Sequence, residues 1–498
     1  MKQRVAIVGA GICGLCAGLQ LAKDGHEVTL IERDAPPPEG GPDEAFFEWN
    51  RRGAAQFRHP HAFLAVMSNL LQESFPDMMD DFWAAGARKI TFEEMLPPEL
   101  QDTYVPAPGD EKLWLLMCRR ATMETVLRRY AERAANLTIL SETLVVDIMT
   151  EPGASHLTLA GLQIRTREGD VTDFPADIVI DAGGRGSKFK DWLGKHGASF
   201  EIEDDDAEIV YYTRHYKLLP GVEEPPRRGK ERSAGDLGYI KYGVFPGDGG
   251  HFAVIVCLPN HETELREAVK DGKLFDRICE QIPGLKPWVA ADKSEATTPS
   301  FGFGDIHAVW NHYVLDGKPA ALNYFAVGDA AVRTNPLYGR GCSTGIIHAH
   351  LLARLIREVA DPMERALTFD RWTEEELRPI FKTSLSEDKN GIKRAIAVKD
   401  GLSLDTADSF RKWLRLAFGD ALGRASREQL HVLRGAMRTF NLLEKPGEFL
   451  KDWRIRLTIL RYMFYGREYN AKARMQNGPS RADMLAMVRD ASAHSEAA

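Results

Sequence analysis

The sequence predicts an α/β protein with a parallel sheet flanked by helices, an inserted antiparallel sheet and a helical C-terminal region. Three observations lead to this fold class. Within residues 5–32 an apolar run, a glycine-rich turn, a helical pattern and a second apolar run follow one another. Residues 200–300 alternate apolar and polar positions in short runs separated by Pro and Gly, which is typical of antiparallel strands. Residues 360–498 have mostly helical periodicity.

The N-terminal unit contains the elements of a nucleotide-binding fold in the required order. Residues 5–8 are wholly apolar, as in a strand buried on both faces. The run Gly9-Ala10-Gly11-Ile12-Cys13-Gly14 follows, and apolar positions in residues 12–23 recur at helical spacing. Residues 26–31 indicate a second strand, which ends at Glu32. This order predicts a Rossmann-type dinucleotide site.

Each residue of this motif has a defined physical task. Gly9 permits the tight turn, Gly11 allows the backbone to approach a pyrophosphate, and Gly14 allows the helix to pack on the strand. The N–H groups at the helix start then face the phosphates. We expect Glu32 to accept hydrogen bonds from an adenosine ribose, with Arg33 beside it as a further cofactor contact.

Two later segments identify the dinucleotide. Residues 176–187 form an apolar run that enters a glycine turn. Residues 326–331 read Ala-Val-Gly-Asp-Ala-Ala, and residues 335–341 read Asn-Pro-Leu-Tyr-Gly-Arg-Gly before a long helical pattern. With the N-terminal motif, these segments resemble the FAD-dependent monooxygenases related to para-hydroxybenzoate hydroxylase, in a branch similar to the styrene monooxygenases and flavin-dependent halogenases.

The resemblance implies FAD as the cofactor and places several residues on it. It implies that Asp329 contacts the ribityl chain, and that the backbone from Asn335 onward faces the flavin ring, where its N–H groups stabilise negative charge on reduced flavin. The implied contacts in this second segment are Pro336, Gly339 and Gly341. The Ala-Gly-Gly at 182–184 departs from the Asp-Gly pair that is commoner in the family.

Two further segments match the family. Residues 118–124 resemble a helix start of the form Arg-x-x-Leu-Glu, whose arginine contacts FAD; Arg120 matches best and Arg119 is the alternative. Residues 52–61 resemble a branch segment of the form Gly-x-x-Gln-x-x-His-x-His. Its two histidines, His59 and His61, lack a Cys or acid at suitable spacing, and we therefore predict no metal site.

Cys13 and Cys16 form a C-x-x-C pair inside the motif helix. Close helix packing requires small residues there, so we interpret both as packing residues rather than as a redox or metal pair.

The segments divide the chain into parts. We expect an FAD-binding domain in residues 1–190, with an inserted segment near 45–115, that is completed by residues 301–360. Residues 191–300 would form the antiparallel sheet of a substrate domain, and residues 361–498 the helical region.

Composition excludes several classes of protein. The net charge of −8 argues against nucleic-acid binding. No run approaches the ~20 apolar residues of a membrane span, and glycines interrupt the N-terminal apolar run in a way that a signal peptide does not show. The six cysteines are scattered, which fits a cytoplasmic protein.

The resemblance implies a monooxygenase that oxidises a hydrophobic, ring-bearing small molecule with molecular oxygen, through a flavin hydroperoxide. No second glycine motif predicts a resident NAD(P)H domain, so NAD(P)H would visit transiently or a separate flavin reductase would supply electrons. No catalytic base is evident. His61, Arg214 and Tyr242 are weak candidates for residues that contact substrate.

Three alternatives remain open. A flavin-dependent halogenase would carry a Trp-x-Trp-x-Ile-Pro stretch, which is absent. A flavin-dependent reductase of isoprenoid lipids is favoured by residues 238–246, which loosely resemble a Tyr-x-Trp-x-Phe-Pro stretch without its tryptophan. A non-catalytic escort module would not need Asp329 or the glycines at 339 and 341.

Residues 451–474 combine basic and apolar side chains. Such a helix can lie on a membrane surface or can dock on the protein with its charges in solvent. We favour docking, in which Trp453, Leu457, Leu460 and Phe464 would form the buried stripe.

Overall fold

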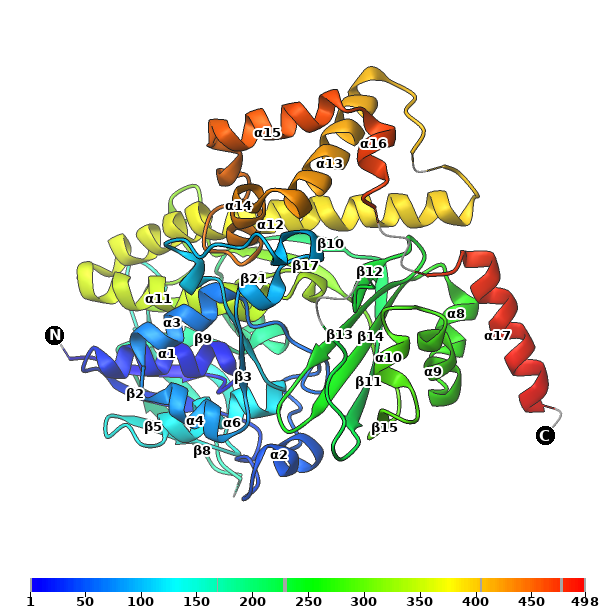
Figure 1. Ribbon diagram of the computed structural model, residues 1–498. Helices are drawn as coiled ribbons and strands as arrows, with labels where there is room; N and C mark the ends of the chain where they lie inside the picture. Colours follow the sequence, from blue (N-terminus) through cyan, green and yellow to red (C-terminus); the bar gives the residue numbers. More distant parts are fainter. Residues whose placement is uncertain (1, 168, 227–230, 404, 475–477, 497–498) are drawn as a thin grey trace.

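The computed structural model describes residues 2–167, 169–226, 231–403, 405–474 and 478–496. Figure 1 shows a helix-flanked parallel sheet beside an antiparallel sheet, with a group of C-terminal helices above both in this view. The predicted fold class is confirmed.

The parallel sheet carries the nucleotide motif. In spatial order its strands are β20 (Tyr324–Ala326), β9 (Ile178–Asp181), β1 (Arg4–Val8), β2 (Glu27–Ile31) and β5 (Leu137–Leu140). Three helices pack together beside it: α1 (Ile12–Lys23), α6 (Arg120–Ala131) and α11 (Gly341–Glu358). Residues 5–7 of the central strand are buried, which explains the apolar run there. The sheet places the end of β1, the end of β20 and the start of α11 at one edge.

Smaller elements surround this core. An antiparallel sheet follows β5 and consists of β6 (Leu144–Thr150), β7 (Leu159–Arg165) and β8 (Val171–Pro175). The segment between β2 and α6 contains α2 (Pro42–Glu48), α3 (Ala65–Ser74), α4 (Met78–Ala84), β3 (Arg88–Ile90), η1 (Glu93–Met95), α5 (Pro98–Gln101), η2 (Asp110–Lys112) and β4 (Leu115–Met117). The connection after β9 contains η3 (Gly184–Gly186) and α7 (Phe189–Lys195).

The second large sheet is antiparallel, as its alternating pattern predicts. Its order is β12 (Ala234–Asp236), β13 (Lys241–Pro246), β14 (His251–Pro259), β11 (Ile209–Leu218) and β15 (Ser294–Ala296), and β16 (Phe301–Phe303) also pairs with β11. Helices α8 (Thr263–Ala268), α9 (Gly272–Glu280) and α10 (Lys286–Val289) lie between β14 and β15 in the chain, and residues of α9 and α10 share one apolar cluster with one face of the sheet. The opposite face approaches the cofactor domain, because Thr213 there contacts His59 of the segment before α3.

A third, smaller antiparallel sheet has three strands. It consists of β10 (Glu201–Asp206), β17 (His307–His312) and β21 (Val332–Arg333), and a hairpin of β18 (Val314–Leu315) and β19 (Lys318–Pro319) follows β17. Between β20 and α11 lie the short turns η4 (Gly328–Ala330) and η5 (Pro336–Tyr338).

The C-terminal helices pack in two separate places. The first group is α12 (Pro362–Lys399), α13 (Phe410–Glu428), α14 (Leu430–Phe440), η6 (Glu448–Lys451), α15 (Trp453–Phe464) and α16 (Arg467–Ala471). The last helix, α17 (Arg481–Glu496), instead packs against α8 and α9 of the antiparallel sheet, as Figure 1 shows. None of the helices among the described residues is both long and apolar enough to cross a membrane.

The predicted buried stripe of α15 is wrong. The helix packs on its neighbours through Ile455, Ile459 and Tyr462, which are at most 3% exposed. The four residues of the predicted stripe are exposed instead: Trp453 by 64%, Leu457 by 55%, Leu460 by 48% and Phe464 by 89%. Two apolar stripes with the same helical spacing run along this helix, and periodicity alone does not distinguish them.

This arrangement predicts opposite results for two neighbouring substitutions. Ile459→Ala should lower the free energy of unfolding by about 2–5 kcal/mol, because it leaves a cavity in the packed face. Leu460→Ala should change it by only about 0.5 kcal/mol, because that side chain is half exposed. Urea denaturation of both variants measures the difference. Equal losses would mean that α15 packs through the other stripe.

Candidate cofactor site

The glycine motif begins the site, and its three glycines differ in what they require. Gly9 has φ +101°, and a Cβ there would lie 2.7 Å from the carbonyl oxygen of Ala182. A Cβ at Gly14 would lie 2.0 Å from the carbonyl oxygen of Gly9. At Gly11, by contrast, the nearest atom is Nη2 of Arg51 at 3.9 Å. The chain itself therefore requires Gly9 and Gly14, whereas the open space at Gly11 fits the approach of a pyrophosphate.

Asp329 lies across this edge of the sheet, on η4. No hydrogen bond joins its carboxylate to another residue in the described ranges, although its surroundings are largely buried. Burial raises the pKa of Asp329, and the positive charges of Arg333, Arg120 and Arg185 oppose that rise. A partly buried carboxylate that has no hydrogen-bond partner in the protein can accept hydrogen bonds from the hydroxyl groups of a ribityl chain.

The backbone after Asp329 turns sharply toward the start of α11. Gly339 has φ +65°, and a Cβ there would lie 2.7 Å from Cβ of Ala62, so the turn and the segment before α3 pack closely. Helix α11 begins at Gly341, where an added Cβ would lie 3.9 Å from Oδ1 of Asp329. The N–H groups of its first turn have no partner within the helix, and they give this end a partial positive charge.

Glu32 makes more contacts within the protein than the sequence predicts. Its Oε2 accepts from the N–H of Ala10 at 2.9 Å, and its Oε1 accepts from the N–H of Asp34 at 3.0 Å. It also forms an ion pair with Arg51 at 3.1 Å, and only 4% of the residue is exposed. Glu32 thus holds the glycine loop in place through its contacts with Ala10 and Arg51. The neighbouring Arg33 is exposed.

Arg51 is the residue near the motif that sequence reasoning missed. It contacts three carboxylates, those of Glu32 at 3.1 Å, Asp34 at 3.2 Å and Glu124 at 3.0 Å. Its Nη2 donates to the carbonyl oxygen of Ala10 at 3.3 Å. Burial is the strongest influence on the pKa of Arg51 and would lower it, but the carboxylates together raise it above the ordinary value. The only signal in the sequence was its position just before the Gly-x-x-Gln-x-x-His-x-His segment.

His61 and Arg120 form a fixed pair. Nδ1 of His61 lies 2.8 Å from the carbonyl oxygen of His59, so Nδ1 carries the proton and Nε2 accepts from Nη1 of Arg120 at 2.9 Å. Burial, and then the charge of Arg120, lowers the pKa of His61 well below its ordinary value. Nε of Arg120 donates to Glu124 at 2.6 Å. The neutral imidazole therefore orients the guanidinium, and His61 is not poised to act as a base.

Arg119 belongs to a different contact. Its backbone N–H and its guanidinium both donate to Asp248, at 2.8 Å and 3.0 Å, and Thr122 donates to the same carboxylate at 2.8 Å. Asp248 lies in the turn between β13 and β14 and is fully buried. Arg119 therefore joins the antiparallel sheet to α6, and of the two candidate arginines only Arg120 is paired with the His61 segment.

The other candidate substrate residues lie on the far face of the antiparallel sheet. Arg214 forms an ion pair with Asp276 of α9 at 2.6 Å and donates to the carbonyl oxygens of Thr298 and Gly272. Tyr242 is buried in the apolar cluster that this face shares with the covering helices. Both lie on the face away from Thr213 and His59, because adjacent positions of a strand point to opposite faces, and their role as substrate contacts stays a prediction.

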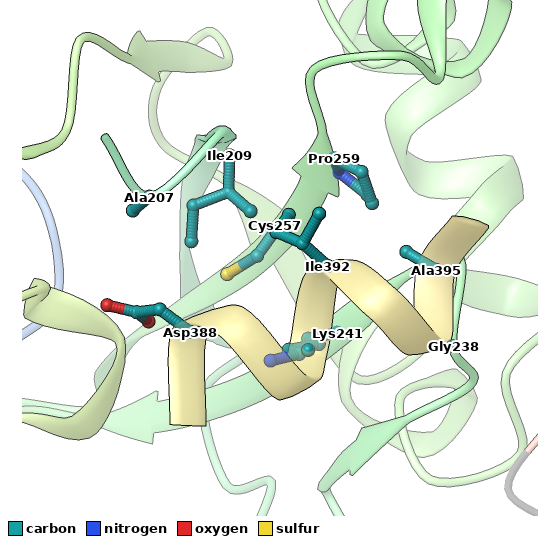
Figure 2. A pocket seen from close by; sticks show the side chains of 10 residues that line it. Ala207, Ile209, Gly238, Lys241, Cys257, Pro259, Asp388, Ile392 and Ala395 are labelled. Carbon is teal, nitrogen blue, oxygen red and sulfur yellow. The ribbon is translucent and has the colours of Figure 1, made fainter. Parts of the chain in front are cut away.

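A small pocket with a cavity volume of about 20 Å³ lies on the face of the sheet that carries Thr213, between β11, β13, β14 and α12. Figure 2 shows Ile209, Cys257 and Ile392 along it, with Lys241 and Asp388 as charged groups. Its lining is Ala207, Ile209, Gly238, Lys241, Cys257, Pro259, Asp388, Gly391, Ile392 and Ala395.

This pocket is connected to the turn before α11 by hydrogen bonds. Asn335 is fully buried, and its Nδ2 donates to Asp388 at 2.6 Å. Tyr338 donates to the same carboxylate oxygen at 3.1 Å, and Tyr211 of β11 donates to Oδ1 of Asn335. Burial raises the pKa of Asp388 to about 6. The network fixes the turn that carries Pro336, Gly339 and Gly341 against the antiparallel sheet.

Comparisons with known proteins agree with this geometry. The family described as "FAD dependent oxidoreductase" matches residues 4–45. Protein Rv3254 of Mycobacterium tuberculosis is 24% identical over 479 residues, which are 89% of this chain and 90% of that protein. Ubiquinone hydroxylase UbiM of Neisseria meningitidis is 23% identical over 367 residues, which are 71% of this chain and 68% of that protein.

The fold is also found in a solved structure. The flavin-dependent brominase Bmp2 superposes with a TM-score of 0.59 at 14% identity, over 95% of this chain and all of that chain. At this identity the likeness shows the shared fold. Together with the family match and the sequence relatives, it confirms the predicted resemblance. Residues 4–45 thus match the FAD-dependent oxidoreductase family, and the chain as a whole is similar in sequence to a ubiquinone hydroxylase and in fold to a flavin-dependent brominase.

Proposed function

We propose that the protein is an FAD-dependent monooxygenase that oxidises a hydrophobic, ring-bearing small molecule. The observation that carries this function is the edge of the parallel sheet, where the open space at Gly11, the unpaired carboxylate of Asp329 and the start of α11 meet. The hydroxylase among the sequence relatives supports oxidation with oxygen. The brominase shares the fold, but this chain lacks the Trp-x-Trp-x-Ile-Pro stretch of halogenases.

Each group of residues would hold one part of FAD. Gly11 and the N–H groups of α1 would bind the pyrophosphate. Glu32 and Arg33 would contact the adenosine, and Asp329 would accept from the ribityl hydroxyls. The turn at 336–341 would face the flavin ring, with Arg120 at its side. Bound FAD would supply the activation of molecular oxygen, with electrons from transiently bound NAD(P)H or from a separate flavin reductase.

The chain's own groups would prepare this environment. His61 stays neutral and keeps the guanidinium of Arg120 in one orientation, held from the other side by Glu124. A fixed positive charge beside the start of α11 stabilises negative charge on a reduced ring without reorganisation. Asn335 and Tyr211 hold the turn against the sheet, which excludes water from that side.

The pocket in Figure 2 is the candidate substrate site beside the flavin turn, and its volume of about 20 Å³ means that it would have to open to admit a ring-bearing compound. Its walls are mostly apolar, and Lys241 and Asp388 are its charged anchors, the composition expected of a small-molecule site. Because Asp388 also holds Asn335 and Tyr338, a substrate bound there would touch residues that position the flavin turn.

Gly11→Ala separates cofactor binding from folding. The side chain meets no protein atom closer than 3.9 Å and φ is −81°, so the unfolding free energy of the FAD-free protein should change by less than about 0.5 kcal/mol. FAD affinity, measured by quenching of flavin fluorescence, should fall at least about tenfold because the methyl group occupies the pyrophosphate approach. Gly194→Ala, also in open space, serves as the matched control. Unchanged affinity in Gly11→Ala would contradict the assignment.

Asp388→Asn tests the buried carboxyl through pH. Burial raises the pKa of this group from 3.8 to about 6, so the folded state binds its proton more tightly than the unfolded chain does. The resulting stabilisation is fully present below about pH 4 and is lost as pH rises through about 6. The amide stays neutral and still accepts from Asn335. The variant should therefore gain about 1–3 kcal/mol relative to the wild type between pH 4 and 8 in urea denaturation. A constant difference across this range would contradict the raised pKa.

The reaction itself can be tested with candidate aromatic or polycyclic substrates. Such a compound should accelerate NAD(P)H oxidation, with or without an added flavin reductase, and product should form only when oxygen is present. Omission of chloride and bromide should leave the rate unchanged. Strict halide dependence would instead indicate a halogenase, and anaerobic turnover to a reduced alkene would indicate an isoprenoid reductase.

A further inference from the structure

Two of the C-terminal helices, α13 and α15, each expose several large apolar side chains. Helices α13 and α15 pack against each other, and Figure 1 shows them with α16 above α12, at the end of the molecule away from the parallel sheet. The exposed side chains are Phe410, Trp413, Leu414 and Phe418 on α13 and Trp453, Leu457, Leu460 and Phe464 on α15. We call these residues, with the basic residues between them, the α13–α15 face.

These side chains are not needed to hold the two helices together. The contact between the helices is made by Ala421 and Ala425 of α13 with Ile455, Ile459 and Tyr462 of α15, all of them buried. The rings of Phe410 and Trp413 stack on each other at 5.9 Å and remain exposed. Soluble proteins seldom expose a large cluster of apolar groups unless it binds a partner or a membrane.

Charge distinguishes between those partners. Residues 410–418 contain Arg411, Lys412 and Arg415, and residues 453–464 contain three arginines; neither segment has an Asp or Glu, in a chain whose net charge is −8. Five guanidinium groups in these two segments form no ion pair with another residue in the described ranges: Arg411, Arg415, Arg454, Arg456 and Arg461. Basic and apolar residues thus alternate around Trp and Phe side chains.

We propose that the α13–α15 face binds the surface of an anionic lipid bilayer. Tryptophan and arginine are suited to the interface, because each has an apolar part that enters the acyl boundary and a polar part that stays at the headgroups. The unpaired arginines complement phosphate groups, whereas a second copy of this basic face would repel the first. The contact is peripheral, because the helices lie on the surface of the protein and bury only their outer side chains in lipid. It does not depend on the proposed oxidation.

Vesicle flotation of the full-length protein tests the proposal. The protein should float with vesicles of phosphatidylcholine and phosphatidylglycerol, and binding should fall steeply in 0.5 M salt or with phosphatidylcholine alone. Arg454→Gln with Arg461→Gln should weaken binding by about 25-fold, roughly fivefold for each charge. Trp453→Ser with Phe464→Ser should weaken it at least about tenfold. Both pairs change exposed side chains, so the melting temperature should stay within about 2 °C.

Matched controls lie on the opposite part of the molecule. Arg165→Gln with Arg167→Gln removes the same charge from exposed positions at and just after the end of β7, and Leu144→Ser with Val171→Ser removes exposed apolar groups from β6 and β8. These variants should bind vesicles as the wild type does. Equal loss in the controls, or no flotation of the wild type with anionic vesicles, would overturn the proposal. So would a concentration-dependent dimer that Trp453→Ser with Phe464→Ser abolishes while flotation is absent, because the face would then bind a second copy.

Discussion

The ion cluster around Arg51 is the interaction on which the rest of the cofactor domain depends. One guanidinium joins the glycine loop, the end of the second strand and helix α6, through three carboxylates and one carbonyl oxygen. All of these groups are buried, and each charge would be costly without the others. Removal of Arg51 would leave three carboxylates close together in a poorly solvated place. The positions of the glycine loop and of Arg120 therefore both depend on Arg51.

The sequence predicts the parts of this structure whose signals are local. The apolar strand, the glycines and the Asp329 turn lie in short segments, where each residue type follows from one backbone requirement. The fold class follows from their order. By contrast, the face on which a side chain lies is a tertiary property. Tyr211 and Tyr212 are both buried aromatic residues of β11, yet Tyr211 donates to Asn335 at the turn before α11, whereas Tyr212 lies in the apolar cluster on the other face. The two apolar stripes of α15 and the role of Arg51 escaped prediction for the same reason.

Charge is distributed in two separate ways over the molecule. Around the start of α11, Arg120, Arg185 and Arg333 act on the single carboxylate of Asp329, and burial makes these fields strong. On the α13–α15 face the arginines lie in solvent. Their attractions for an anionic surface add together there and are screened by salt. The first arrangement suits charge that develops on a ring, and the second suits a broad anionic surface. An acidic chain can hold both because its carboxylates are concentrated elsewhere.

The order of strands in the parallel sheet has a consequence for biosynthesis. β20 completes the sheet beside β9, and α11 follows only after it, although β1 and α1 leave the ribosome first. The whole antiparallel sheet is translated between these two halves. A nascent chain therefore carries the glycine loop long before the residues opposite it exist, and its apolar strands stay uncovered during that interval. The last strand of the parallel sheet and α11 can therefore join the N-terminal domain only after the whole antiparallel sheet has been translated.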